Sequence, residues 1–83
     1  MNESNVSESV INELALLIKA HMDINYGQQG AMEIYEMFIN RLDRAIDEGD
    51  LPSNCFFKIV MATNKIETEK LPIKETLIDA LKK

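Results

Sequence analysis

The residue types that most often carry chemistry are scarce in this chain, which has one histidine, His21, and one cysteine, Cys55. Nucleophilic catalysis by a Ser–His–Asp or Cys–His set needs a histidine beside the nucleophile, and no histidine follows Cys55. A zinc site needs three or four ligands, and His21 has only Asp23 close by in the sequence. We therefore expect no enzyme activity and no bound metal. We expect Cys55 to be a buried structural thiol and His21 to face solvent or the end of its helix.

Two other pairs of residues have a spacing that resembles a metal site or a phosphate-binding loop, but neither pair completes one. Glu33 and Glu36 lie one helical turn apart, but a bundle that binds two metal ions uses Glu-x-x-His pairs, and the chain has none. Gly27 and Gly30 lack the length and the following lysine of a phosphate-binding loop. No cofactor is therefore expected, and binding through the protein surface remains as the means of function.

Charge is unevenly distributed along the chain, whose formal net charge is −5. Residues 1–49 contain nine acids and three bases, whereas residues 50–83 contain five acids and six bases. Binding to nucleic acid requires a cationic surface that displaces counterions, and the first half has none. The acidic half favours a basic protein partner, or simply contributes to solubility.

No segment resembles a membrane anchor or a secretory signal. The longest uninterrupted apolar run, residues 14–18, is far too short to span a bilayer. Residues 1–5 have neither a basic region nor an apolar region. A lone cysteine fits a reducing compartment, so we expect a cytoplasmic protein without a transmembrane segment.

The strongest structural pattern is the apolar stripe within residues 30–48, which predicts an amphipathic helix that ends at Gly49. Three other helices are expected near residues 7–24, 53–64 and 72–82. Together they predict an all-α protein, an antiparallel four-helix bundle, in a single domain over residues 1–83 with residues 1–6 frayed. The stripe residues are Ala31, Ile34, Tyr35, Phe38, Ile39, Leu42, Ala45 and Ile46.

Local signals suggest where these helices begin and end. Asn5 and Glu8 resemble a capping box, and Gly27 is expected to end the first helix. Asp50 or Ser53 is expected to cap the third helix and Pro72 to open the fourth. Residues 63–66 are expected to end the third helix, and residues 67–71 to form a polar linker. The third helix is apolar nearly all round, so it is placed at the centre of the bundle. The predicted core comprises Phe38, Leu42, Phe56, Ile59, Val60 and Leu77.

Residues 62–66 (Ala-Thr-Asn-Lys-Ile), together with residues 67–69 and 77–81, resemble the immunity proteins of pediocin-type bacteriocins. Residues 33–43 add to the resemblance in the second predicted helix. Gly30-Ala31 and Leu51-Pro52 also resemble helical immunity proteins of other toxin systems. The resemblance implies a short cytoplasmic four-helix bundle that protects a producer cell. Such a protein binds a toxin directly or recognises a receptor-bound bacteriocin at the inner face of the membrane.

Two surfaces are candidates for recognition of a protein partner. The first is the acidic face of the second predicted helix, which comprises Glu33, Glu36, Asp43 and Asp47, with Met37 beside it. The second is the last helix with Lys74, Lys82 and Lys83, as the resemblance implies. The alternative function is a small regulatory or adaptor module that docks on another bacterial or phage protein or forms a homodimer. A solvated helix face without a partner also accounts for the acids.

Overall fold

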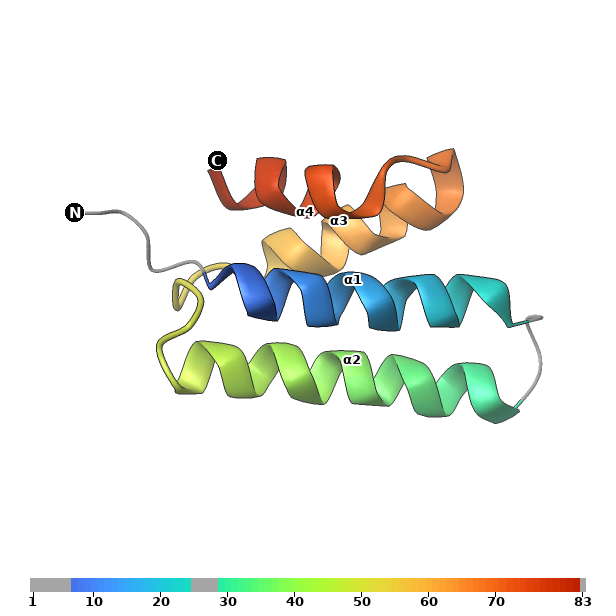
Figure 1. The fold of residues 1–83 in the computed structure, drawn as a ribbon, viewed down its shortest axis with the longest axis horizontal. Helices are drawn as coiled ribbons and strands as arrows, with labels where there is room; N and C mark the ends of the chain where they lie inside the picture. Colours follow the sequence, from blue (N-terminus) through green and yellow to red (C-terminus); the bar gives the residue numbers. More distant parts are fainter. Residues whose placement is uncertain (1–6, 25–28, 83) are drawn as a thin grey trace.

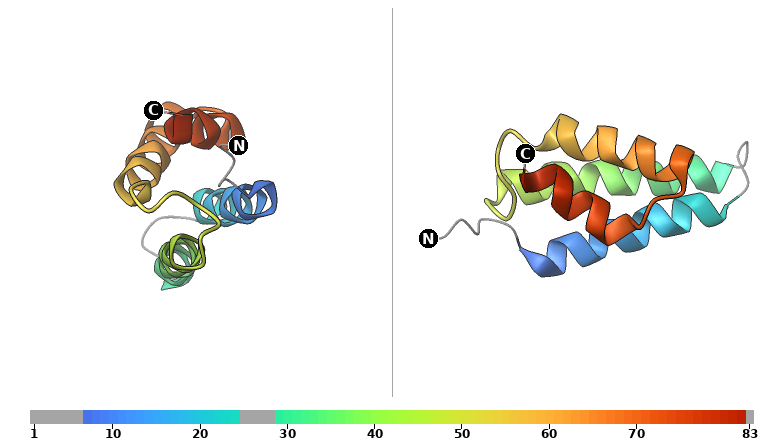
Figure 2. Two further views of the ribbon diagram at one scale, coloured as in Figure 1. Left: turned by 90° about the vertical axis from the view of Figure 1, so that its left-hand side faces the viewer. Right: turned by 90° about the horizontal axis from the view of Figure 1, so that it is seen from above.

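The computed structural model describes residues 7–24 and 29–82, which form four helices and no strand (Figure 1). Successive helices run in opposite directions (Figure 1), and α1 lies beside α2 and α3 beside α4 when the molecule is viewed from the end (Figure 2). This arrangement confirms the predicted all-α, antiparallel four-helix bundle. The predicted frayed segment, residues 1–6, falls outside the described residues. The helices are α1 (Glu8–Asp23), α2 (Gln29–Asp47), α3 (Phe56–Glu69) and α4 (Ile73–Lys82).

The central helix of the bundle is α1, and the prediction that the third helix is central is wrong. One side of α1 packs along α2 and another packs against α4, whereas α3 packs mainly on α4 and barely contacts α2. On α3, Phe57 and Met61 are 75% and 68% exposed. The inner face of α3 is already filled by Ile59, Ala62 and Ile66, so the remaining apolar side chains lie on the outside.

The ends of α3 differ from the prediction at both sides. The N–H of Cys55 donates to the carbonyl of Pro52 at 3.2 Å, so residues 52–55 form a turn and the helix begins at Phe56. Cys55 takes the N-cap position without a side-chain cap, in place of Asp50 or Ser53. The helix then continues to Glu69, through residues 63–66 and most of the predicted linker.

The C-terminal extension of α3 has a packing reason. Ile66 lies seven residues after Ile59 and is fully buried, so one more helical turn completes the buried stripe. The helix ends at Lys70, which has a left-handed backbone (φ 59°) and donates its N–H to the carbonyl of Ile66.

The other helix boundaries agree with the sequence to within a few residues. Gly49 has φ 85°, which confirms the predicted left-handed end of α2. Pro72 stands directly before α4, and its carbonyl accepts the N–H of Thr76 at 3.1 Å. Ser7 takes the N-cap position of α1 without a side-chain cap, so Glu8 is the first residue of the helix and not the third, as the predicted capping box required. Helix α1 ends at Asp23, before the predicted stop. The predicted roles of Asn5 and Gly27 fall outside the described residues.

Four of the six predicted core side chains are fully buried, and two are not. Phe56 and Val60 are only partly buried, because they lie at the edge of the inner face of α3. The prediction left out the α1 side chains that pack at the centre. The confirmed core residues are Phe38, Leu42, Ile59 and Leu77, and the buried residues of α1 are Val10, Ile11, Leu14 and Ile18.

Candidate protein-binding surfaces

The acidic face of α2 is exposed along its whole length. Glu33, Glu36, Asp43 and Asp47 all lie on the solvent side of the helix. Their spacing of three, seven and four residues keeps them on one side of an α-helix. At about 1.5 Å per residue, they extend over about 21 Å. The structure therefore brings together the four acids that the sequence proposed as a binding face.

The negative charge of this face is not neutralised by the two arginines of α2. Arg41 Nη2 contacts Glu13 Oε1 of α1 at 2.7 Å, and Arg44 Nε contacts Glu48 Oε2 at 3.3 Å. Within the described part of the chain, none of the four acids forms an ion pair. Both arginines are thus engaged with other carboxylates, and the face retains a negative potential.

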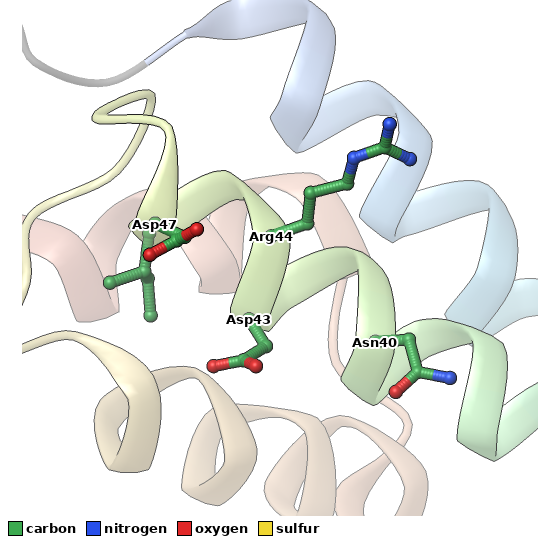
Figure 3. Close-up of a pocket in the computed structure, with 5 residues that line it drawn as sticks. Asn40, Asp43, Arg44 and Asp47 are labelled. Carbon is green, nitrogen blue, oxygen red and sulfur yellow. The ribbon is translucent and has the colours of Figure 1, made fainter.

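A shallow hollow of about 420 Å³ lies on this face, lined by Asn40, Asp43, Arg44, Ile46 and Asp47 (Figure 3). Asp43 and Arg44 point to opposite sides of α2 in Figure 3, Arg44 toward α1 and Asp43 toward α3. The hollow is polar and open to solvent, so it suits contact with a polar protein surface rather than enclosure of a small molecule.

Met37 lies one helical turn after Glu33, on the side of α2 that faces α1. It is 56% exposed and, with Leu17 and Arg41, lines a hollow of about 320 Å³ between the two helices. Asn40 and Arg44 line both this hollow and the one on the acidic face. Met37 therefore borders both the α1–α2 groove and the Glu33 end of the acidic face.

The lysines of α4 form no continuous cationic surface. Lys74 and Lys82 are exposed, but Glu75 and Asp79 are exposed between them. On the end-on view in Figure 2, α4 lies across the bundle from α2. Lys83 falls outside the described residues. The two predicted surfaces are consequently separate, and the surface on α4 carries mixed charge.

An exposed apolar surface on α3 was missed by the sequence reasoning. Phe57 and Met61 lie one helical turn apart, and the ring of Phe56 packs edge to face against that of Phe57 with centroids 5.5 Å apart. Met61 also borders a groove of about 440 Å³ between α3 and α4. The available signal was the number of apolar residues on α3, which exceeds what one inward face can hold. The groove is lined by Lys58, Met61, Ala62, Lys65, Leu71, Thr76, Asp79 and Ala80.

A second missed feature is a contact between His21 of α1 and Glu67 of α3. His21 Nδ1 and Glu67 Oε2 are 2.6 Å apart, and the two side chains are only 13% and 15% exposed. The ring of Tyr35 lies 5.5 Å from the His21 ring, so the contact joins three helices. The expectation that His21 faces solvent or its own helix end is wrong. Its spacing, seven residues after Leu14, already placed it close to the buried stripe.

The remaining chemistry-bearing residue, Cys55, is a buried free thiol, as predicted. Burial raises the pKa of the Cys55 thiol above its ordinary value of 9.0, more than a backbone hydrogen bond and the charge of Lys58 lower it. Among residues 7–24 and 29–82, no group of three or more His, Cys, Asp or Glu side chains is placed to hold a metal ion. No helix of this part is long and apolar enough to cross a bilayer.

Comparison of the chain with protein-family models, with curated proteins and with solved structures returns no match. Functional inference for this chain therefore depends on the surfaces described above.

Proposed function

We propose that this chain is a non-enzymatic protein-binding domain that captures a basic protein on the acidic face of α2. We further propose that it is a cytoplasmic immunity protein, which protects the producer cell from a cognate bacteriocin or toxin. The observation that carries the proposal is the row of four exposed acids without ion-pair partners among the described residues. Such a face attracts cationic proteins over several ångströms and orients them as they approach.

The physical demands on an immunity protein agree with this surface. A protecting protein must bind its toxin before the toxin acts, so a high association rate is an advantage. Complementary charge raises association rates more than it raises intrinsic affinity. The resemblance of residues 62–69 and 77–81 to pediocin-type immunity proteins adds the expected class of partner, a bacteriocin alone or bound to its receptor.

The competing surface on α4 has less support from charge. Lys74 and Lys82 alternate with Glu75 and Asp79, so their potentials partly cancel at distances beyond a few ångströms. A partner would have to contact α4 closely to distinguish it from other mixed surfaces. We therefore assign the initial capture of the partner to α2.

A protection assay tests this function. A sensitive bacterial strain that expresses the chain is challenged with a panel of cationic pediocin-type bacteriocins. We expect the original chain to protect against at least one of them and the double variant Glu36→Lys/Asp43→Lys to lose most of that protection. The control variant Glu75→Lys/Asp79→Lys makes the same change of charge on α4, and it should still protect.

Two results would contradict the proposal. Failure of the original chain to protect against every bacteriocin of the panel would contradict the immunity function. Full protection by the α2 double variant, with loss in the α4 control, would move recognition to the last helix. Circular dichroism of each purified variant shows whether the fold is retained.

The exposed apolar face of α3 favours a second candidate function, a regulatory or adaptor module that docks on another protein. Aromatic and methionine side chains are enriched at the cores of protein interfaces. In that case Phe57→Ser abolishes the interaction, whereas the charge reversals on α2 leave it intact. The two variants therefore separate the two candidates in one binding assay.

A further inference from the structure

The side of the molecule between α2 and α3 has an ordered pattern of charge and apolar surface. We call Glu36 and Asp43 of α2 the acidic edge, and Lys58 and Lys65 of α3 the basic edge. The apolar strip lies between them and is formed by partly buried or exposed side chains of both helices. The residues of the apolar strip are Ile39, Ile46, Phe56, Phe57, Val60 and Met61.

On α2, the order follows from contacts with α1. Arg41 contacts α1 through Glu13, and Asp43 points to the opposite side, toward α3 (Figure 3). Ile39 and Ile46 lie four residues before and three residues after Asp43, which places them beside it on the helix surface. Both are partly buried against the core. The acidic edge is therefore next to apolar surface on the side of α2 toward α3.

On α3, the two flanks are marked by their neighbours. Glu67 reaches His21, and Phe56 and Val60 share its flank because they lie eleven and seven residues before it. Lys58 and Lys65 line the groove with α4, so they lie on the opposite flank. Phe57 and Met61 face outward between these flanks, and the exposed Asn64 lies beside Met61. From α2 to α4, the order is thus acidic edge, apolar strip, basic edge.

We propose that this side binds a second copy of the chain, related by a two-fold axis parallel to the helices. Rotation about such an axis exchanges the two edges, so the acidic edge of each copy lies opposite the basic edge of the other, and the apolar strips meet. A two-fold axis across the helices would instead place acid against acid. The charge pattern therefore favours a second copy in this orientation, with Asp79 of α4 as an acid that lines the same groove as Lys58 and Lys65.

The side chains involved suit a protein interface. Phe57 and Met61 are the side chains of α3 that leave the most apolar surface in water. Within the described residues, Lys58 and Lys65 form no ion pair, so both are available to carboxylates of a second copy. A standard interface takes about 800 Å² from each partner. That area is about one seventh of the 5450 Å² surface of this chain. The dimer covers Glu36 and Asp43, so a second copy and a basic toxin would compete for the acidic edge, and dimerisation is measured without any toxin.

The first test measures the mass of the purified full chain by sedimentation equilibrium over a wide range of protein concentration. We expect a reversible monomer–dimer equilibrium and no larger species. Phe57→Ser should weaken the dimer at least tenfold. The matched control Leu16→Ser removes an equally exposed side chain from the outer face of α1 and should leave the equilibrium unchanged. A monomer at every concentration would overturn the proposal, and open-ended assembly would exclude the two-fold axis.

A charge exchange tests the orientation. One variant carries Lys58→Glu and Lys65→Glu, and the other carries Glu36→Lys and Asp43→Lys. Each variant alone should dimerise more weakly than the original chain, because its two edges then have the same sign. An equimolar mixture should restore a heterodimer, since each altered edge then meets its opposite. If each variant alone dimerises as well as the original chain, or if the mixture restores nothing, the proposed orientation is wrong.

Discussion

Helices α1 and α3 have a similar share of apolar residues, but the bundle uses them in different ways. α1 lies between α2 and α4 and buries Leu14 completely. α3 packs chiefly on one neighbour and presents Phe57 and Met61 to solvent. The number of apolar residues in a helix thus indicates how much favourable free energy their burial would contribute. It does not indicate whether another helix of the same chain covers them. The outer face of α1 exposes Leu16 alone among its large apolar side chains, whereas α3 exposes two that are neighbours, and we propose that a second copy of the chain covers them.

The largest expected difference is in stability. Leu14→Ala in α1 should lower the free energy of unfolding by about 3–5 kcal/mol, because it leaves a cavity at the centre of the bundle. Met61→Ala in α3 should change it by less than about 0.5 kcal/mol in the monomer, because the side chain is largely in water. Urea unfolding at low protein concentration measures both. Equal losses would mean that α3 is as central as α1.

A second expected difference concerns the two phenylalanines of the predicted core. Phe38 is fully buried, so Phe38→Ala should cost about 3–5 kcal/mol of unfolding free energy. Phe56 is only partly buried at the edge of α3, so Phe56→Ala should cost about 1–2 kcal/mol. Thermal unfolding of the two variants in parallel shows which substitution lowers the stability more. A larger loss at Phe56 would contradict the boundary of the core.

The contact between His21 of α1 and Glu67 of α3 should make a smaller contribution to the free energy of unfolding. A double-mutant cycle with His21→Ala and Glu67→Ala should give a coupling energy of about 1–2 kcal/mol, because both side chains are largely shielded from solvent. The cycle is measured by urea unfolding at neutral pH. Simple additivity of the two losses would show that the contact does not hold α1 against α3.

Cys55, at the start of α3, should make stability depend on alkaline pH. Burial raises the pKa of this thiol in the folded chain above its ordinary value of 9.0. The unfolded chain therefore loses the proton first as pH rises, and the free energy of unfolding should fall above that value. Below it the thiol is protonated in both states and has no such effect.

The variant Cys55→Ala is the control for the other groups that titrate at alkaline pH. It should lose less stability than the original chain between neutral pH and alkaline pH, as measured by urea unfolding. Parallel pH curves for the two proteins would contradict the raised pKa of the thiol.

The smallest effect on stability is expected on the acidic face of α2. Asp43→Lys should change the free energy of unfolding by less than about 0.5 kcal/mol, because an exposed charge without an ion pair contributes little. Chemical unfolding of the variant at low protein concentration measures the change. A large loss of unfolding free energy would mean that Asp43 stabilises the fold. Its exposure would then not support a role in binding a partner.

The sequence predicted the bundle well because periodicity and end signals act within one helix. The stripe from Ala31 to Ile46 and the left-handed Gly49 depend on local geometry alone. The extent of α3 was missed because Ile66 is held by packing on other helices, which overrides a polar segment. The partner of His21 was missed for a similar reason, since Glu67 is 46 residues away.

The candidate surfaces also differ in whether local sequence patterns or packing between helices determine them. The exposure of Glu33 and Asp47 follows from their place opposite the apolar stripe of α2, so the sequence could indicate it. The outward direction of Phe57 and Met61 depends on the number of neighbours around α3, which no local pattern records. An excess of apolar residues on one helix therefore indicates one of two things, a position at the centre of the bundle or an interface with another molecule.

The central claim is that the outer face of α3 is an interface, and oxidation of methionine tests it most directly. Met61 lies in the apolar strip, whereas Met37 lies on the α1 side of α2 and serves as an exposed control. Oxidation by hydrogen peroxide is followed at each methionine by mass spectrometry, over increasing protein concentration. We predict that the oxidation rate of Met61 falls as the dimer forms, while that of Met37 stays constant. Equal rates for Met61 at all concentrations, or an equal fall at both residues, would contradict the claim.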